Sequence, residues 1–201
     1  MFGPEHPQTL ISVSNLGWLL QHQNKFEEAE GMYRRALETQ EKVLGPEHLV
    51  TLIGVNNLGT ILYDQGKFDE AKALYRRALE IREKVLGPEH PDTLNSINNL
   101  GAFLQSQGKF EEAEAILRGA LEIQEKVLGP EYPDTLISVS NLGTVLQRQG
   151  KFDEAEAMHR RALEIREKVL GPEHADTHIS VNSLGKVLQN RRKLDEARSM
   201  Y

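Results

Sequence analysis

The tripeptide Asn-Leu-Gly recurs along the chain every 42 residues, and no other feature of the sequence restricts the fold as strongly. It stands at Asn15-Leu16-Gly17, Asn57-Leu58-Gly59, Asn99-Leu100-Gly101 and Asn141-Leu142-Gly143, and a fifth copy reads Ser183-Leu184-Gly185. A fixed period of roughly 20–50 residues is typical of stacked arrays, in which each unit contacts only its neighbours. We therefore expect a single array over 1–201, with units at about 3–44, 45–86, 87–128, 129–170 and 171–201, the last of them incomplete.

Each unit contains the signals of two helices, and the unit at 87–128 shows them clearly. Pro91 and Asp92 suit the first turn of a helix, because proline needs no amide partner there and a carboxylate meets the positive end of the helix dipole. Apolar residues follow at helical spacing, and Gly108 stands where a left-handed residue ends a helix. A second apolar stripe continues through Val127 and Leu128. We expect helices at about 91–107 and 110–128.

Small residues indicate how the two helices pack. Gly101 lies inside the first helix, where glycine costs about 1 kcal/mol relative to alanine. Because a glycine recurs at this place in every unit, we expect it to permit a close approach of the second helix at Ala113. Neither helix can bury its apolar stripe alone, so each pair must stack on the next.

Leu100-Gly101, Leu104, Ala113 and Ala120 stand where tetratricopeptide repeats place their large and small core residues. The long second helix and the Gly-Pro-Glu-His or Gly-Pro-Glu-Tyr loop resemble the repeats of kinesin light chain, and the resemblance covers essentially the whole chain. It implies an all-α fold, an α-solenoid of stacked antiparallel helix pairs that forms a right-handed superhelix. It also implies a protein–protein interaction scaffold that binds an extended peptide segment of a partner in its concave groove, as an adaptor or as the sensor region of a larger protein.

In arrays of this kind, the arc of the first helix that faces away from the second helix lines the groove, and asparagine there holds the ligand backbone. The resemblance transfers that role to Asn15, Asn57, Asn99 and Asn141. The full set that we predict for peptide binding is Asn15, Asn57, Asn99, Asn141, Asn56, Asn98, Trp18, Tyr63, Gln105, Gln147 and Arg148. Amide side chains suit this role because they both donate and accept hydrogen bonds.

The ends of this surface differ from its middle. Trp18 and Tyr63 are expected to supply an apolar pocket toward the N-terminal end, and Arg148 with Lys186 a site for an acidic side chain toward the C-terminal end. An alternative remains open for the asparagines, which in mid-helix can bond to a neighbouring helix and set the stacking angle instead of binding a ligand.

Composition excludes several other classes of function. The net charge is −6 and no basic run occurs, which argues against nucleic acid and membrane partners. The chain has no cysteine, no apolar run of the ~18 residues that span a membrane and no signal-peptide pattern, so a cytoplasmic protein is expected. His174 and His178 are four residues apart but lack a third ligand, so neither a metal nor a cofactor is expected. Repeats place like residues in rows rather than around one point, so we predict no enzyme.

Two alternatives to peptide binding stay open. Both ends of the array are expected to expose apolar stripes, so the chain can be a structural array that self-associates, as a homo-oligomer through its ends. From the resemblance alone, it can also be the autoinhibitory C-terminal repeat region of a signalling ATPase.

Overall fold

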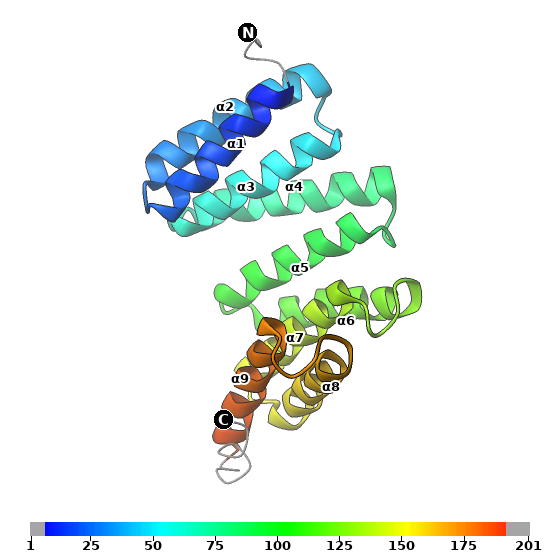
Figure 1. Ribbon diagram of the computed structural model, residues 1–201. Helices are drawn as coiled ribbons and strands as arrows, with labels where there is room; N and C mark the ends of the chain where they lie inside the picture. Colours follow the sequence, from blue (N-terminus) through cyan, green and yellow to red (C-terminus); the bar gives the residue numbers. More distant parts are fainter. Residues whose placement is uncertain (1–6, 192–201) are drawn as a thin grey trace. The chain divides into compact units, whose positions relative to one another are not determined.

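The computed structural model describes residues 7–191, and all the regular structure in that part of the chain is α-helical (Figure 1). The helices are α1 (Pro7–His22), α2 (Phe26–Leu44), α3 (Leu49–Asp64), α4 (Phe68–Leu86), α5 (Pro91–Ser106), α6 (Phe110–Val127), α7 (Pro133–Arg148), α8 (Phe152–Leu170) and α9 (Ala175–Asn190). Odd-numbered helices begin the repeats and even-numbered helices complete them. The end of the incomplete fifth unit, 192–201, lies outside the described residues.

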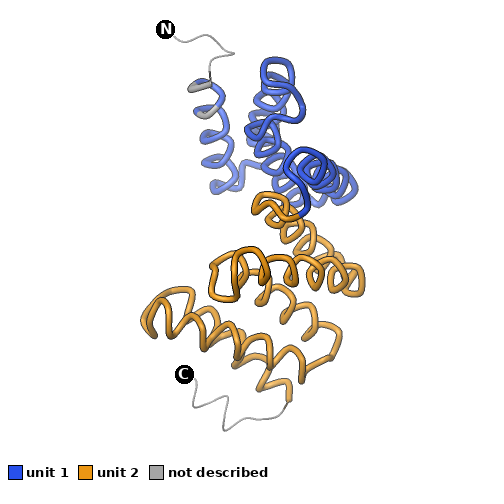
Figure 2. The backbone as a smooth tube through the Cα atoms, turned by 90° about the vertical axis from the view of Figure 1, so that its right-hand side faces the viewer, with its two compact units in different colours: residues 1–88 blue, residues 89–201 orange. Residues whose placement is uncertain are grey.

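The chain divides into two compact units, 1–88 and 89–201 (Figure 2). In the first, α1 packs on α2, α2 on α3 and α3 on α4. In the second, α5 to α9 also pack in chain order, and α7 in addition contacts both α5 and α9. Each unit is thus a stack of antiparallel helix pairs, and the division between the units falls at the junction of the second and third repeats.

The helices end where the local signals place them. α5 begins at Pro91 and ends at Ser106, and Gly108 has a φ of 71°, which confirms the expected left-handed turn. Asn24 takes the same place in the first repeat with a φ of 58°, a conformation that asparagine tolerates better than most residues. His90 caps α5, because its Nδ1 accepts a hydrogen bond from the backbone N–H of Asp92 at 3.1 Å.

The side chain that lies nearest to Gly101 is Leu117, and not Ala113 as the sequence predicted. A Cβ atom added to Gly101 would lie 2.7 Å from Cδ2 and 2.8 Å from Cγ of Leu117, and all three of its nearest atoms belong to that side chain. The glycine therefore makes room for a large residue one helical turn beyond the alanine. Ala113 is nevertheless fully buried, as its place on the apolar stripe requires.

The core follows the predicted stripes with one shift. Leu94, Leu104 and Leu117 are buried, as apolar residues at helical spacing should be, whereas Val127 at the end of α6 is 44% exposed. Gln124 is fully buried instead, because it lies seven residues, two helical turns, after Leu117 and so faces the same side. The stripe of α6 therefore includes a polar residue.

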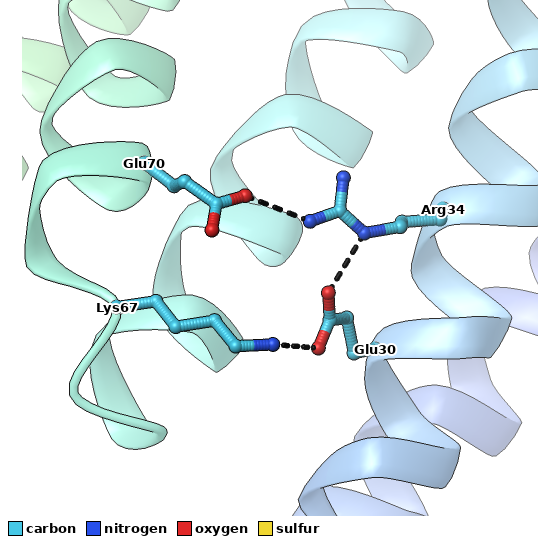
Figure 3. Close-up of polar contacts among 4 residues, drawn as sticks. All are labelled: Glu30, Arg34, Lys67 and Glu70. Atoms are coloured by element: carbon cyan, nitrogen blue, oxygen red, sulfur yellow. Dashed lines mark hydrogen bonds and ion pairs between the residues drawn. The ribbon is translucent and has the colours of Figure 1, made fainter.

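Ion pairs connect consecutive repeats on the exposed side of the even-numbered helices (Figure 3). Glu30 on α2 accepts hydrogen bonds from Arg34 and from Lys67 of the next repeat, both at 2.7 Å, and Arg34 also donates to Glu70 at 2.9 Å. Burial acts to raise the pKa of Glu30, but the bonds from Lys67 and Arg34 together outweigh it and lower this pKa. The second unit has the same arrangement around Glu114.

Candidate functional site

The second unit presents two adjoining pockets on the side of its odd-numbered helices. One lies between α5 and α7, measures about 400 Å³ and is lined by Ala102, Gln105, Ser106, Gly108, Phe110 and Arg148. The other lies between α7 and α9, measures about 720 Å³ and is lined by Thr144, Gln147, Arg148, Phe152, Lys186, Gln189 and Asn190. We call these 12 residues the α5–α7–α9 surface. Arg148, at the end of α7, lines both pockets.

This surface carries positive charge that no described residue neutralises through an ion pair. Arg148 and Lys186 are exposed, and within the described residues neither forms an ion pair or a side-chain hydrogen bond. By contrast, Lys151 and Arg118 in the same unit are both paired with Glu114. Two free cations in one pocket, beside amide and hydroxyl groups, are suited to binding an anionic side chain.

Three of the residues predicted for peptide binding line these pockets, namely Gln105, Gln147 and Arg148. Asn99 and Asn141 do not line them, because they lie earlier in α5 and α7. Asn99 is exposed and Asn141 half-buried, and neither side chain has a bonding partner in the described part of the chain. Asn15 and Asn57 of the first unit, the former exposed and the latter half-buried, likewise have no side-chain partner among the described residues.

The neighbouring position in the repeat behaves differently. Asn98 is only 5% exposed, and its Oδ1 accepts a hydrogen bond from Oγ of Ser138 on α7 at 2.9 Å. Asn98 thus links α5 to α7, which is the packing role that the sequence left open. Asn56 is half-buried, and its Oδ1 has no hydrogen-bond partner in the described structure. The binding role predicted for Asn56 therefore stays a prediction, whereas Asn98 is left out of the candidate site.

The two aromatic residues predicted for the site, Trp18 and Tyr63, each contact a ring close by in sequence. Trp18 is 56% exposed and lies 3.9 Å from the ring of His22, centre to centre. Tyr63 lies 5.6 Å from the ring of Phe68. Near these residues in sequence, Gln21 on α1 donates a hydrogen bond to Asp64 on α3 at 2.6 Å. Trp18 and Tyr63 thus contact different rings, and these contacts do not bring them into one pocket. The apolar pocket expected from the two residues stays a prediction.

Sequence reasoning did not include Phe110 and Phe152, the first residues of α6 and α8, in the predicted site. Each is half-buried and lines a pocket, because it directly follows the turn that joins the two helices of its repeat. Both residues stand a few positions after the end of the preceding helix, and this spacing is the sequence signal that could have placed them at the site. With these rings, each pocket combines an aromatic wall with polar groups.

The described part of the chain contains neither a metal site nor a membrane-spanning helix. In the region 7–191, no three His, Asp or Glu side chains come together as a metal site would require. Over the same residues, no helix has the length and apolar character needed to cross a membrane.

Comparison with known proteins identifies the repeats. Models described as tetratricopeptide repeat match residues 92–168 and 137–201, and a second model of the same description matches 9–49 and 55–92. No curated protein matches the chain.

Among solved structures, an array of nearly identical tetratricopeptide-like repeats from a candidate kinesin light chain of Podosopora anserina is similar over 98% of this chain and 93% of its own, with 29% identity and a TM-score of 0.81. A variant of that array covers 100% of this chain and 93% of its own, with 27% identity and a TM-score of 0.83. BtubC (BKLC) from P. vanneervenii matches 96% of this chain and 77% of its own, with 26% identity and a TM-score of 0.82.

Together, the matches to the two family models extend over both compact units. One of the models alone matches more than half of the sequence. They confirm the all-α architecture of stacked helix pairs and the likeness to kinesin light chain repeats. The chain belongs to the tetratricopeptide repeat family.

Proposed function

We propose that this chain is a protein-interaction scaffold that binds an extended peptide segment of a partner on the α5–α7–α9 surface. Acidic side chains of the peptide bind at Arg148 and Lys186, and its backbone bonds to the amide groups of Gln105 and Gln147. The proposal assigns no catalysis to the chain, and its setting is the cytoplasm.

The observation that carries this proposal is the pair of pockets that share Arg148. A row of two adjoining pockets suits alternate side chains of an extended segment better than a compact ligand. The phenyl rings of Phe110 and Phe152 give each pocket an apolar wall. The unpaired charges of Arg148 and Lys186 add a preference for acidic residues.

The test is selection from a display library of random ten-residue peptides, followed by titration of one selected peptide. We expect selected peptides to be enriched in Asp and Glu, and Arg148→Gln with Lys186→Gln to weaken binding at least tenfold. Lys126→Gln is the matched control, because Lys126 is 80% exposed and stands outside both pockets. Selection of neutral or basic peptides, or unchanged binding by the double variant, contradicts the proposal.

The asparagines can be tested in the same assay. Asn99→Ala and Asn141→Ala remove two amide groups that have no partner in the described structure, so the fold should keep its stability. If these residues hold the backbone of the ligand, affinity falls for every selected peptide, regardless of its sequence. Unchanged affinity, with the fold intact by circular dichroism, would assign the binding to the pockets alone.

A second candidate function is self-association through α1. Leu16 and Leu19 on α1 are 43% and 47% exposed, whereas their equivalents Leu58 and Ile61 on α3 are 3% and 0% exposed. In the last described repeat the same face is covered by a helix, because Leu163 of α8 packs against Leu184 of α9. We propose that a second copy of the chain covers the α1 face.

Light scattering over a concentration series tests this second function. We expect mass to rise with concentration in the unmodified chain and to stay at that of a monomer when Leu16→Glu and Leu19→Glu are combined. Equal masses for both proteins at the highest concentration would remove self-association through α1.

A further inference from the structure

A single buried position in the even-numbered helices carries a polar side chain in all four complete repeats. The residues are Gln40, Arg82, Gln124 and Arg166, and they are 2%, 5%, 0% and 7% exposed. The fold therefore accepts either an amide or a guanidinium at the same place. The hydrogen-bond partners of Arg166 and the pocket that it lines all lie within the second unit.

Within the part of the chain that the structure describes, Arg166 is a buried cation whose bonding partners are all neutral. Its Nη1 donates to Oγ of Ser180 at 2.5 Å and to Oγ of Ser140 at 3.2 Å. Among the described residues, no carboxylate lies within ion-pair distance of the guanidinium. A guanidinium has five N–H donors, and a buried charge without a counter-ion is costly. The structure thus leaves donors of Arg166 available for an anion.

Arg166 lines a pocket of about 350 Å³ between α7, α8 and α9. Its walls are mainly apolar and include Leu136, Ile137, Val169 and Leu170. This pocket is formed by the N-terminal ends of α7 and α9, whereas the α5–α7–α9 surface uses their C-terminal ends. Residues 136 and 147 of α7 are separated by about 16 Å along the helix axis, so the two sites are distinct.

The acidic residues that line this pocket do not serve as a counter-ion for Arg166. Glu131 accepts a hydrogen bond from Lys168 at 2.8 Å, and Asp176 lies 3.9 Å from Nδ1 of His174. Their side chains are 53% and 55% exposed, so water screens their charges. Burial lowers the pKa of Arg166, and the charge of Asp176 acts in the opposite direction. Of the charged side chains that line the pocket, Arg166 is the most deeply buried.

We propose that this pocket binds a carboxylate attached to an aliphatic group about the size of a leucine side chain. The carboxylate bonds to the guanidinium of Arg166, and the aliphatic group packs against Leu136, Ile137 and Val169. Apolar walls favour such a ligand over phosphate, which would need polar groups around all its oxygens. The same chemistry is found on a free branched-chain acid and on the last residue of a peptide.

The experiment is a titration of the whole chain with N-acetyl-leucine, followed through the methyl NMR signals of Leu136 and Ile137. We expect saturable shifts with N-acetyl-leucine and at least tenfold weaker binding of N-acetyl-leucinamide, which has the side chain without the charge. Arg166→Gln should weaken binding of the acid at least tenfold. This variant copies the residue that the chain buries at Gln124, so we expect it to fold.

Two further variants separate a binding role from a structural one. Ile137→Asn copies Asn95, the residue at the equivalent place in the preceding repeat, and should weaken binding several-fold by making one wall polar. Arg161→Gln removes a charge on α8 that pairs with Glu125 outside the pocket, and should leave binding unchanged. Equal binding of acid and amide, no saturable shift, or full binding by Arg166→Gln or Ile137→Asn each overturns the proposal.

Two further ligands distinguish a free acid from the last residue of a peptide as the source of the carboxylate. A tetrapeptide that ends in leucine with a free carboxylate is compared with N-acetyl-leucine and with the amidated tetrapeptide. Tighter binding of the free tetrapeptide than of N-acetyl-leucine supports a chain terminus as ligand, and equal or weaker binding supports a small acid. Binding of the amidated tetrapeptide as tight as that of the free one contradicts a carboxylate site.

Discussion

The two compact units are built from the same helix pair but fill the space opposite its glycine differently. In the first unit, Gly17 faces the ring of Tyr33 and Gly59 faces the ring of Tyr75. In the second unit, Gly101 faces Leu117 and Gly143 faces His159. The missing Cβ of the odd-numbered helix thus leaves a space that accepts a phenol, an isobutyl group or an imidazole.

The polar atoms of these side chains have different surroundings. The hydroxyl of Tyr75 lies 3.1 Å from Oγ1 of Thr60, so this buried ring has a partner at its polar end. His159 is 1% exposed, and its Nε2 has no hydrogen-bond partner in the described structure. Burial, with a smaller contribution from the charge of Arg166, lowers the pKa of His159 to about 4. Because the residue opposite the glycine is a histidine only in the second unit, only that unit should lose stability in acid through this position.

The largest predicted effect is a loss of stability of the second unit in mild acid. The pKa of His159 is about 4 in the folded chain and 6.5 in the unfolded chain. Between these values the unfolded chain takes up a proton that the folded chain does not, so the free energy of unfolding falls as pH falls. The contribution is fully present above pH 6.5, and its loss at pH 4 is about 3 kcal/mol. Urea unfolding at a series of pH values measures it.

The control for this prediction is His159→Leu, which copies Leu117. Acidic groups elsewhere also affect stability below pH 4.5, but they do so in both proteins, so the difference between the two curves isolates His159. We expect the two free energies to diverge progressively from about pH 6.5 downward. Parallel curves across the whole range would mean that His159 is not buried in its neutral form.

Substitution of the glycine itself has the next largest effect. In Gly101→Ala the new Cβ lies 2.7 Å from Leu117, and overpacking of this kind costs about 1–3 kcal/mol, offset by less than 1 kcal/mol of helix propensity. Gly59→Ala should cost less, because the nearest atom of Tyr75 is 3.1 Å away. Gly119 lies on the exposed side of α6 with nothing within 4 Å, so Gly119→Ala should stabilise the chain. Thermal unfolding of the three variants gives the order, and an equal loss in all three would contradict it.

The sequence predicted features that depend on residues close together in the chain. Pro91 and Gly108 marked the ends of α5 to within one or two residues, because each acts on its own backbone. The partner of Gly101 was missed by one helical turn, since a period gives the face of a helix but not its offset along a neighbouring helix. The pockets beside Arg148 form between α5, α7 and α9, which are not consecutive, and nothing local encodes the distance between them.

A smaller effect is expected from the ion pairs that occur in both units. Glu114 accepts hydrogen bonds from Lys151 at 2.7 Å and from Arg118 at 2.9 Å, and mainly the bond from Lys151 lowers its pKa to about 2. Its contribution to stability is present above pH 4.5 and is lost as pH falls toward 2. Because both partners are more than 40% exposed, Glu114→Gln should cost only about 1 kcal/mol at neutral pH.

Glu30→Gln provides the matched change in the first unit, where the distances are nearly the same. We expect the two substitutions to cost similar amounts at low salt and less in 1 M salt, because the cations are exposed. A cost that differs by more than about 1 kcal/mol between them would show that the two units do not use this arrangement equally.

The smallest predicted effect concerns a cap that the first unit has and that one helix of the second lacks. His48 caps α3 through a bond from the backbone N–H of Val50 to Nδ1 at 3.2 Å, and His90 and His174 cap α5 and α9 in the same way. Tyr132 takes this position before α7 and makes no cap. Tyr132→His should therefore add one hydrogen bond and stabilise the chain by about 0.5 kcal/mol. The gain requires a neutral imidazole that can accept, so thermal unfolding at pH 8 should show it and unfolding at pH 5 should not. Tyr132→Phe, which keeps the ring and cannot cap, serves as the control and should change neither value.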